Sequence, residues 1–243
     1  MTPTPDGIVF WERGFITING TIVFTWFVML LIVGISAIAT RRLSSGRSIS
    51  RWQNVLEVIV TTVRHQMDEM LDRDDLKYLS FVGALFIFIS VSNLLMVLPF
   101  YQPPTASFSM TAALAIAVFV AVPVFGIAEK GVRAYLAHYL QPSPLMLPFN
   151  IISELSRTLS LAVRLFGNIM SGTMIVGVLL SIAPLLVPLI MEALGLLIGQ
   201  IQAYIFAALA TVYIGSGVRS RDESERKRLR AQQKKQEGEK HGD

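Results

Sequence analysis

The sequence predicts an all-α membrane protein with about five transmembrane helices, and three observations support this. Of its 243 residues, 53% are hydrophobic and only 16% are charged, whereas a soluble domain carries about 25% charged residues. The charges gather in 41–77, 129–133 and 219–243 and nearly vanish elsewhere. The apolar stretches between them are long enough to cross a bilayer, which takes about 20 residues per helix.

The first part of the membrane region, residues 18–147, is predicted to hold three spans after an external N-terminus of residues 1–17. The spans cover about 18–39, 78–98 and 110–128. Charged residues or prolines follow each of them, and these residues mark where the chain leaves the hydrocarbon core.

A polar segment between the first two spans is predicted to form an amphipathic helix on the cytoplasmic side, at about 50–75. Apolar residues recur there every three or four positions from Trp52 to Met67, while Glu57 and Asp68 lie on the other face. This pattern is typical of a helix at the membrane surface. A soluble helix between the spans is the alternative.

Residues 148–217 predict a long, tilted helical hairpin. Its first helix covers about 149–182, which at 1.5 Å per residue is roughly 50 Å long, whereas the bilayer core is about 30 Å thick. The helix must therefore tilt strongly or run partly along the surface. Pro184 and Pro188 mark the turn into the second long helix, which ends near Gly217.

The basic residues predict the orientation. Residues 40–77 hold seven Lys and Arg, residues 129–147 hold two, and the tail, 218–243, holds nine. With five spans, these three segments fall on one side, which the positive-inside rule makes the cytoplasm. The N-terminus is then outside and the C-terminus cytoplasmic. The tail is poor in apolar residues and is predicted to be disordered.

The composition excludes several kinds of site. The chain has no cysteine, so it has neither disulfides nor thiolate metal ligands. His65, His138 and His241 are far apart, and we expect no metal and no cofactor. We find no phosphate-binding glycine loop and no nucleophile–base pair, so we do not expect the chain to be catalytic by itself. The net charge of +4 is mild and does not indicate nucleic-acid binding.

The first long helix carries a polar stripe centred on Arg164. At 100° per residue, Arg157, Ser160 and Asn168 all lie within about 40° of it. Arg157 is about 10 Å nearer the cytoplasmic end, where its side chain can snorkel. Arg164 is deeper, and an arginine at mid-helix costs at least ~2.5–3.5 kcal/mol. A cost of that size favours a functional role for Arg164.

The partner of Arg164 distinguishes a structural role from a functional one. Within the chain, Glu154 is about 80° off the stripe, and Glu192 on the last long helix is the other candidate. The alternative is a carboxylate on another chain, or water. Arginine suits that role because it stays protonated at any cellular pH.

Two motifs on the long helices resemble subunit a of the bacterial F-type ATP synthases. Ser160–Gly172 reads Ser-Leu-Ala-Val-Arg-Leu-Phe-Gly-Asn-Ile-Met-Ser-Gly, and Ile201–Phe206 reads Ile-Gln-Ala-Tyr-Ile-Phe. Pro148–Glu154 is also similar to the family's sequence. The similarity is strong over about 145–215, whereas residues 1–75 add little.

The resemblance implies an ion-translocating subunit in the inner membrane of a bacterium. Such a subunit supplies two half-channels to the carboxylates of a c-ring and couples proton or sodium flow to rotation and ATP synthesis. The implied partners are the c-ring subunits, the peripheral-stalk b subunits, the lipid bilayer and, indirectly, the catalytic head. The residues implied to form the ion path are Arg164, Ser160, Asn168 and Gln202, with Glu154 and Arg157 at a cytoplasmic half-channel.

The chain departs from the family at the outer half-channel. The family commonly has a glutamate or histidine nine residues after the arginine, where this chain has Thr173. The paired position on the last long helix is Gly195, which cannot titrate either. We expect Glu192, about 15 Å outward of Gln202, to replace the missing acid. The departure also suggests a sodium-using or N-type variant.

Other functions make different predictions. A stand-alone secondary transporter would show inverted repeats and interrupted helices, and the sequence has no two-fold repeat. A structural or insertion-type membrane protein could also hold a deep arginine. The stripe around Asn168 and the motif around Gln202 argue against it, although an interhelical hydrogen bond with no transport role is an alternative for Gln202.

Overall fold

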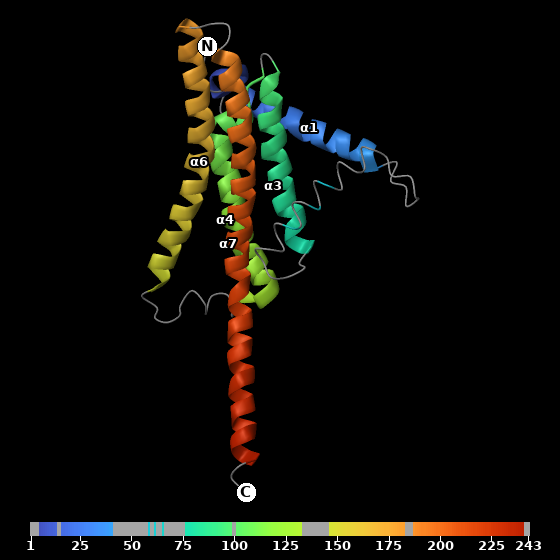
Figure 1. The fold of residues 1–243 in the computed structure, drawn as a ribbon, viewed down its shortest axis with the longest axis vertical. Helices are drawn as coiled ribbons and strands as arrows, with labels where there is room; N and C mark the ends of the chain where they lie inside the picture. The colour runs from blue at the N-terminus through green and yellow to red at the C-terminus, as the bar shows by residue number, and fades with distance from the viewer. Residues whose placement is uncertain are drawn as a thin grey trace.

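Five long helices form most of the part of the chain that the computed structural model describes (Figure 1). They are α1 (Gly20–Thr40), α3 (Leu76–Leu94), α4 (Phe108–Lys130), α6 (Met146–Ile182) and α7 (Val187–Lys240). Short elements are the 3-10 turns η1 (Pro5–Gly7), η2 (Leu95–Val97) and η3 (Pro104–Ala106) and the antiparallel strands β1 (Val9–Arg13) and β2 (Ile16–Asn19). The described residues are 5–13, 16–40, 58, 61, 65, 76–98, 101–132, 146–182 and 187–240.

Each of the five helices is long and apolar enough to cross a membrane. This confirms the predicted all-α membrane fold with about five spans. The apolar stretches are Gly20–Ile38, Tyr78–Val97, Phe108–Ala128, Pro148–Ser181 and Leu189–Gly215.

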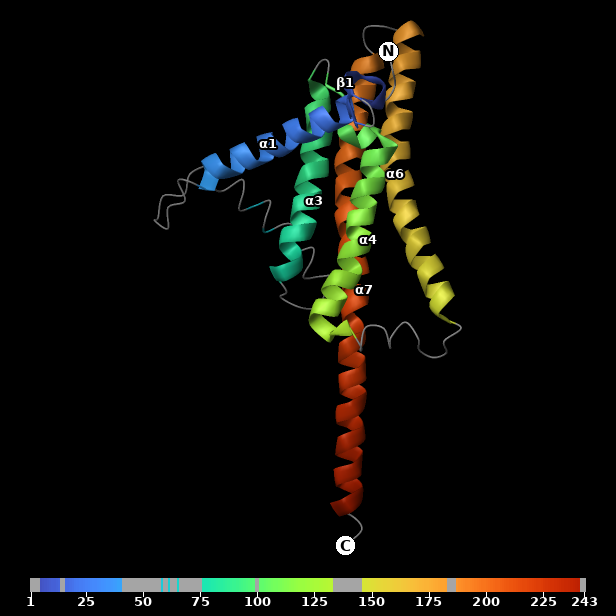
Figure 2. The same ribbon diagram turned by 180° about the vertical axis from the view of Figure 1, so that it is seen from behind.

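Four of the five long helices form a bundle, and α1 lies apart from it. α3, α4 and α7 run side by side, α6 lies alongside α4 and α7, and α1 leaves the bundle at a steep inclination (Figures 1 and 2). The N-terminal elements lie at the same end of the bundle as the α3–α4 connection, and the end of α7 lies at the opposite end. We call the former the N-terminal end of the bundle.

The core lies where α3, α4, α6 and α7 meet, and Ile89, Leu165 and Phe206 are fully buried there. The helices are buried to different extents. Only 11% of the apolar stretch of α6 is buried, against 39% for α4. Most of the surface of α6 is therefore left uncovered by the described part of the chain.

Polar side chains tie α3 to α7 inside the bundle. The Asn93 amide donates to the carbonyl oxygen of Gly199 at 2.8 Å, and its own oxygen accepts from the Thr105 hydroxyl at 3.1 Å. Ser90 and Gln200 form a second pair, in which the Gln200 amide donates to the Ser90 carbonyl oxygen at 3.0 Å. Interhelical bonds of this kind contribute about 0.6–2 kcal/mol each in a membrane.

The structure differs from the sequence predictions at both ends of the chain. The first helix begins at Gly20 and not near 18, because Ile16–Asn19 pairs with β1 in a hairpin inside the predicted external N-terminus. At the other end, α7 continues as a helix to Lys240 through the tail predicted to be disordered. The tail is rich in Arg, Lys, Gln and Glu, and these residues favour helix.

The predicted surface helix at about 50–75 lies almost entirely outside the described residues. Only Val58, Thr61 and His65 are described there, each in a helical conformation and exposed.

Gly199 provides a test of the contact between α3 and α7. A Cβ added there would lie 3.1 Å from Asn93 Cβ and Nδ2, and Asn93 cannot easily move because both ends of its amide are hydrogen-bonded. We expect Gly199→Ala to destabilise the folded chain by about 1–3 kcal/mol through overpacking, measured as thermal unfolding in detergent. Gly83→Ala is the matched control, since nothing lies within 4 Å of its Cβ position. Equal stability of the two variants would show that this contact is not tight.

Candidate functional site

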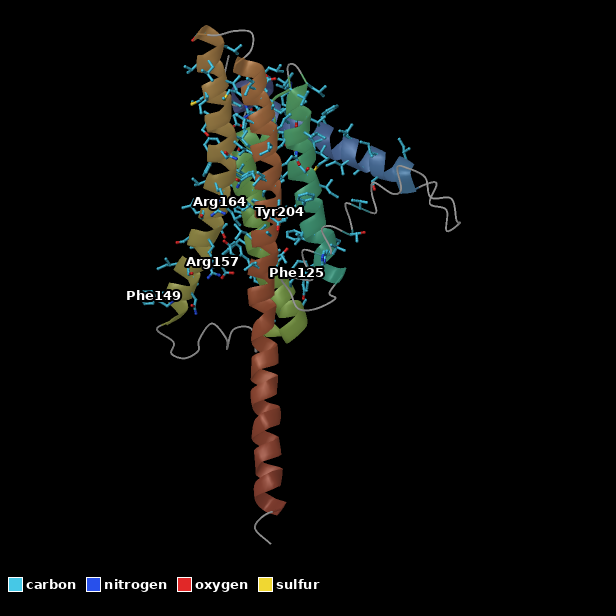
Figure 3. All side chains as sticks on the ribbon, viewed as in Figure 1. Phe125, Phe149, Arg157, Arg164 and Tyr204 are labelled. Carbon is cyan, nitrogen blue, oxygen red and sulfur yellow. The ribbon has the colours of Figure 1, made fainter. Side chains whose placement is uncertain are left out.

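Arg164 lies in the middle of α6, at the margin of its buried face (Figure 3). The neighbouring Leu161 and Leu165 are 2% and 0% exposed and anchor the helix to the core. Arg164 itself is exposed. The core contacts of the leucines therefore fix the rotation of α6 and hold Arg164 on the open side.

No side chain in the described part of the chain pairs with the Arg164 guanidinium. Neither Glu154 nor Glu192, the two carboxylates considered from the sequence, forms an ion pair with it. Arginine stays charged in any cellular environment, and an unpaired charge at membrane depth is costly. The guanidinium thus needs a counter-charge or water from outside this part of the chain.

Arg157 lies on the same helix, nearer its N-terminal end (Figure 3), and Glu154 precedes it by about one turn. The Arg157 guanidinium sits over the Tyr213 ring, 5.6 Å from its centroid. This cation–π contact joins α6 to α7. Glu154 is half-buried, and its backbone oxygen accepts a hydrogen bond from the Thr158 hydroxyl at 2.9 Å.

The rest of the polar stripe runs along α6 on both sides of Arg164. Ser160 is exposed and Asn168 is half-buried. The Ser171 hydroxyl donates to the Asn168 backbone oxygen at 3.0 Å, so this serine bonds its own helix. The Asn168 side chain remains available to a neighbour.

Gln202 lies on α7 and is buried, with 6% of its surface exposed. Ala203 and Phe206 on the same helix are fully buried in the core. The structure does not connect the Gln202 amide to Arg164 by a hydrogen bond. It does place Arg164 on α6 and Gln202 on α7, and these two helices of the hairpin pack against each other.

The three positions considered for the missing acid are exposed to different extents. Glu192 is exposed on α7. Thr173 and Gly195, the two positions at which the sequence was expected to depart from the family, are both half-buried. The Thr173 hydroxyl donates to the Met170 backbone oxygen at 2.9 Å, and a Cβ at Gly195 would meet open space.

The sequence alone reveals only part of the polar interior. Ser90, Ser92 and Asn93 stand out as a polar cluster in an apolar span, but their partners on α7 and η3 cannot be inferred from spacing. Asp6 also goes unnoticed in the sequence. Its carboxylate accepts hydrogen bonds from Thr21 at 2.6 Å and Ser107 at 2.7 Å. Among the described residues, no three His, Cys, Asp or Glu side chains gather to hold a metal ion.

Comparison with known proteins assigns this chain to a family. Residues 22–215 match the family model described as the ATP synthase A chain, so the similarity extends well beyond the motifs on the long helices. The chain is 58% identical over 218 residues to ATP synthase subunit a 1 of Chlorobium luteolum, covering 90% of this chain and 98% of that protein. It is 56% identical to ATP synthase subunit a of Albidiferax ferrireducens, covering 91% and 96%.

A third relative, ATP synthase subunit a 2 of Acaryochloris marina, is 59% identical over 213 residues, covering 88% of this chain and 91% of that protein. The match spans most of the chain in every case. The chain belongs to the ATP synthase A-chain family, as subunit a of the membrane sector.

Proposed function

We propose that the chain carries the coupling ion through this membrane sector, with Arg164 facing the carboxylates of a rotating c-ring. The observation that carries the proposal is the placement of Arg164 at mid-span, exposed and unpaired within the described part of the chain. The adjacent face of α6 is fixed to the core by Leu161 and Leu165. The open side is therefore where a partner that supplies negative charge would bind.

The physical role of Arg164 follows from its permanent charge. An opposite charge within about 4–6 Å lowers the pKa of a carboxyl by about one to three units. A ring carboxyl that arrives beside Arg164 would therefore release its ion. The same fixed charge repels protons and cations and so prevents direct leakage between the two half-channels.

The remaining stripe residues would guide the ion. Ser160 and Asn168 lie on the same side of α6 and offer a hydroxyl and an amide to a hydrated path. Gln202 would contribute from α7, and Arg157 with Glu154 would lie at the cytoplasmic half-channel. The ion moved is a proton or sodium, and its flow would drive rotation of the ring and ATP synthesis in the catalytic head.

The arrangement of the helices supports a tilted hairpin. α1 is 21 residues long, enough to cross a bilayer of about 30 Å near the normal. Because α6 and α7 are steeply inclined to α1 (Figure 2), they would then lie tilted. A tilted α6 of 37 residues would present its polar stripe along the side of a ring.

The orientation and partners complete the proposal. We place the protein in a bacterial inner membrane with the N-terminus outside and the C-terminus in the cytoplasm, because the basic residues then lie inside. The N-terminal end of the bundle and the end of α7 lie on opposite sides of the molecule, as this requires (Figure 1). The partners would be the c-ring and the peripheral-stalk b subunits.

Substitution of Arg164 tests the central role. Without the positive charge, the pKa of the facing ring carboxyl would rise by about one to three units. We therefore expect Arg164→Gln to lower ion-driven ATP synthesis in membrane vesicles by about 10- to 1000-fold, which is the equivalent of that change in pKa. Leu159→Gln is the matched control, since it puts the same amide on an exposed position of α6 about 140° away. Arg164→Gln with undiminished synthesis would refute the role.

Glu192 tests the assignment of the outer acid. If Glu192 passes protons at the outer half-channel, Glu192→Gln should lower ion-driven ATP synthesis about tenfold, or about 1.4 kcal/mol, because the amide cannot titrate. Glu192→Asp should retain most of the activity. Synthesis by Glu192→Gln at the normal rate, in complexes that assemble normally, would show that Glu192 is not that acid.

A further inference from the structure

Hydrogen bonds join the N-terminal segment to the starts of α1 and α4. The Asp6 carboxylate accepts from the Thr21 hydroxyl at 2.6 Å and from the hydroxyl of Ser107, which directly precedes α4, at 2.7 Å. The Gly20 amide, at the first residue of α1, donates to the Ile8 carbonyl oxygen at 2.7 Å. The hairpin of β1 and β2 is therefore held beside the start of α1 (Figure 2).

Strand β1 leaves three consecutive apolar side chains uncovered by the described part of the chain. Val9, Phe10 and Trp11 are 53%, 60% and 48% exposed. In a regular strand, neighbouring side chains point to opposite faces of the sheet. Here Val9 pairs with Asn19 and Trp11 pairs with Ile18, so Phe10 is an extra residue in β1. Such a β-bulge bends the strand and can re-aim a side chain, and it lies at the three exposed apolar residues.

The pairing register relates each residue of β1 to the membrane span that follows the hairpin. Val9 pairs with Asn19, which directly precedes the apolar stretch of α1. Arg13, at the other end of β1, pairs with Ile16, about 10 Å further along the hairpin. In the same direction, the sequence of β1 changes from three apolar residues to the charged pair Glu12 and Arg13. β1 is therefore apolar at the end paired beside the span and charged at the other end.

The change from apolar to charged residues matches the headgroup zone of a bilayer. This zone is about 5–8 Å deep on each side of the hydrocarbon core, which is comparable with the length of the hairpin. Tryptophan is enriched there because its ring has both an apolar body and a polar N–H group. The hairpin cannot lie deeper, because the outer edges of a two-stranded sheet carry backbone groups that hydrocarbon cannot satisfy. Its position and composition therefore both fit the lipid interface.

The exposed apolar surface continues from the hairpin onto α1. Four apolar residues that recur every three or four positions are 38–64% exposed there, namely Ile22, Trp26, Met29 and Val33. Only 11% of the apolar stretch of α1 is buried. A surface that continues into a membrane span is suited to lipid. A protein partner on the hairpin would not require the change from apolar to charged residues along β1.

We propose that Val9, Phe10 and Trp11 form an interfacial anchor, which binds the phospholipid interface at the N-terminal end of the bundle. The apolar side chains contact the upper part of the acyl chains, and the Trp11 ring lies at the level of the headgroups. Interfacial aromatic residues help to set the depth and tilt of membrane helices. Because Asp6 joins the segment to α1 and α4, the anchor holds the starts of both helices at this interface. The inference does not rest on the proposed ion path.

Fluorescence quenching by brominated lipids tests where Trp11 lies. The chain has three tryptophans, so Trp26→Phe/Trp52→Phe leaves Trp11 as the only one in the full chain, reconstituted in phosphatidylcholine vesicles. We expect bromines placed near the headgroup to lower Trp11 emission more than bromines near the ends of the acyl chains. Trp11→Phe/Trp52→Phe is the matched control. It leaves Trp26, which lies six residues into α1 and about 9 Å deeper, so the order should be reversed.

The other possible surroundings of Trp11 give different results in the same vesicles. Quenching by iodide in the water, with no effect of brominated lipids, would show that Trp11 faces water. Quenching by neither reagent would show that protein covers it. Each of these results, or stronger quenching of Trp11 by bromines near the chain ends, would overturn the proposal.

A second variant tests whether the anchor holds α1 at its depth. In Phe10→Ser/Trp11→Ser on a Trp52→Phe background, Trp26 is the only tryptophan. The serine hydroxyls favour water, so we expect the start of α1 to move outward and the quenching of Trp26 to shift toward bromines near the headgroup. Phe10→Tyr/Trp11→Tyr keeps rings with an apolar body and a polar tip, and the depth of α1 should not change, although tyrosine fluorescence must be separated by exciting Trp26 alone. An unchanged depth of Trp26 in the serine variant would refute the anchoring role.

Discussion

The charge of Arg164 in an apolar helix is the constraint on which the rest of the account depends. Placing an arginine at mid-span costs at least ~2.5–3.5 kcal/mol, and the described part of the chain provides no counter-charge. The fold holds the side chain on the open face, because Leu161 and Leu165 bury the adjacent face. The requirement for a counter-charge or water from outside this part of the chain is therefore built into the rotation of α6.

The two long helices have unequal surroundings, and this difference follows from the same constraint. α7 contacts α3, α4 and α6 and is fixed by buried polar bonds such as that from Asn93 to Gly199. α6 keeps most of its surface outside the bundle. A fixed α7 can hold Gln202 and the buried polar residues in place while α6 presents its stripe to a moving partner. A fixed α7 and an exposed α6 are both needed by the proposed ion path beside a rotating ring.

Much of the fold could be predicted from the sequence because hydropathy and charge sorting are direct consequences of the bilayer. The stripe around Arg164 was also predictable, since helical periodicity alone places Ser160 and Asn168 beside it. The bonds of Asp6 to Thr21 and Ser107 were not, because they join residues 15 and 101 positions apart. The hairpin of β1 and β2 is local, and it was missed because the first apolar span was extended back to residue 18. The position of Gln202 relative to Arg164 depends on how α6 and α7 pack, and this packing cannot be inferred from the spacing of residues along one helix.

Cross-linking in the assembled membrane sector tests the central claim most directly. A cysteine at Ser171 would lie on the exposed stripe within about 20° of Arg164, and a cysteine at Leu159 about 140° away. The account predicts that Ser171→Cys forms disulfides with single cysteines placed beside the ring carboxylate and that Leu159→Cys does not. Failure of Ser171→Cys to cross-link to the ring, in a complex that still makes ATP, would contradict the claim that Arg164 faces a carboxylate of another chain.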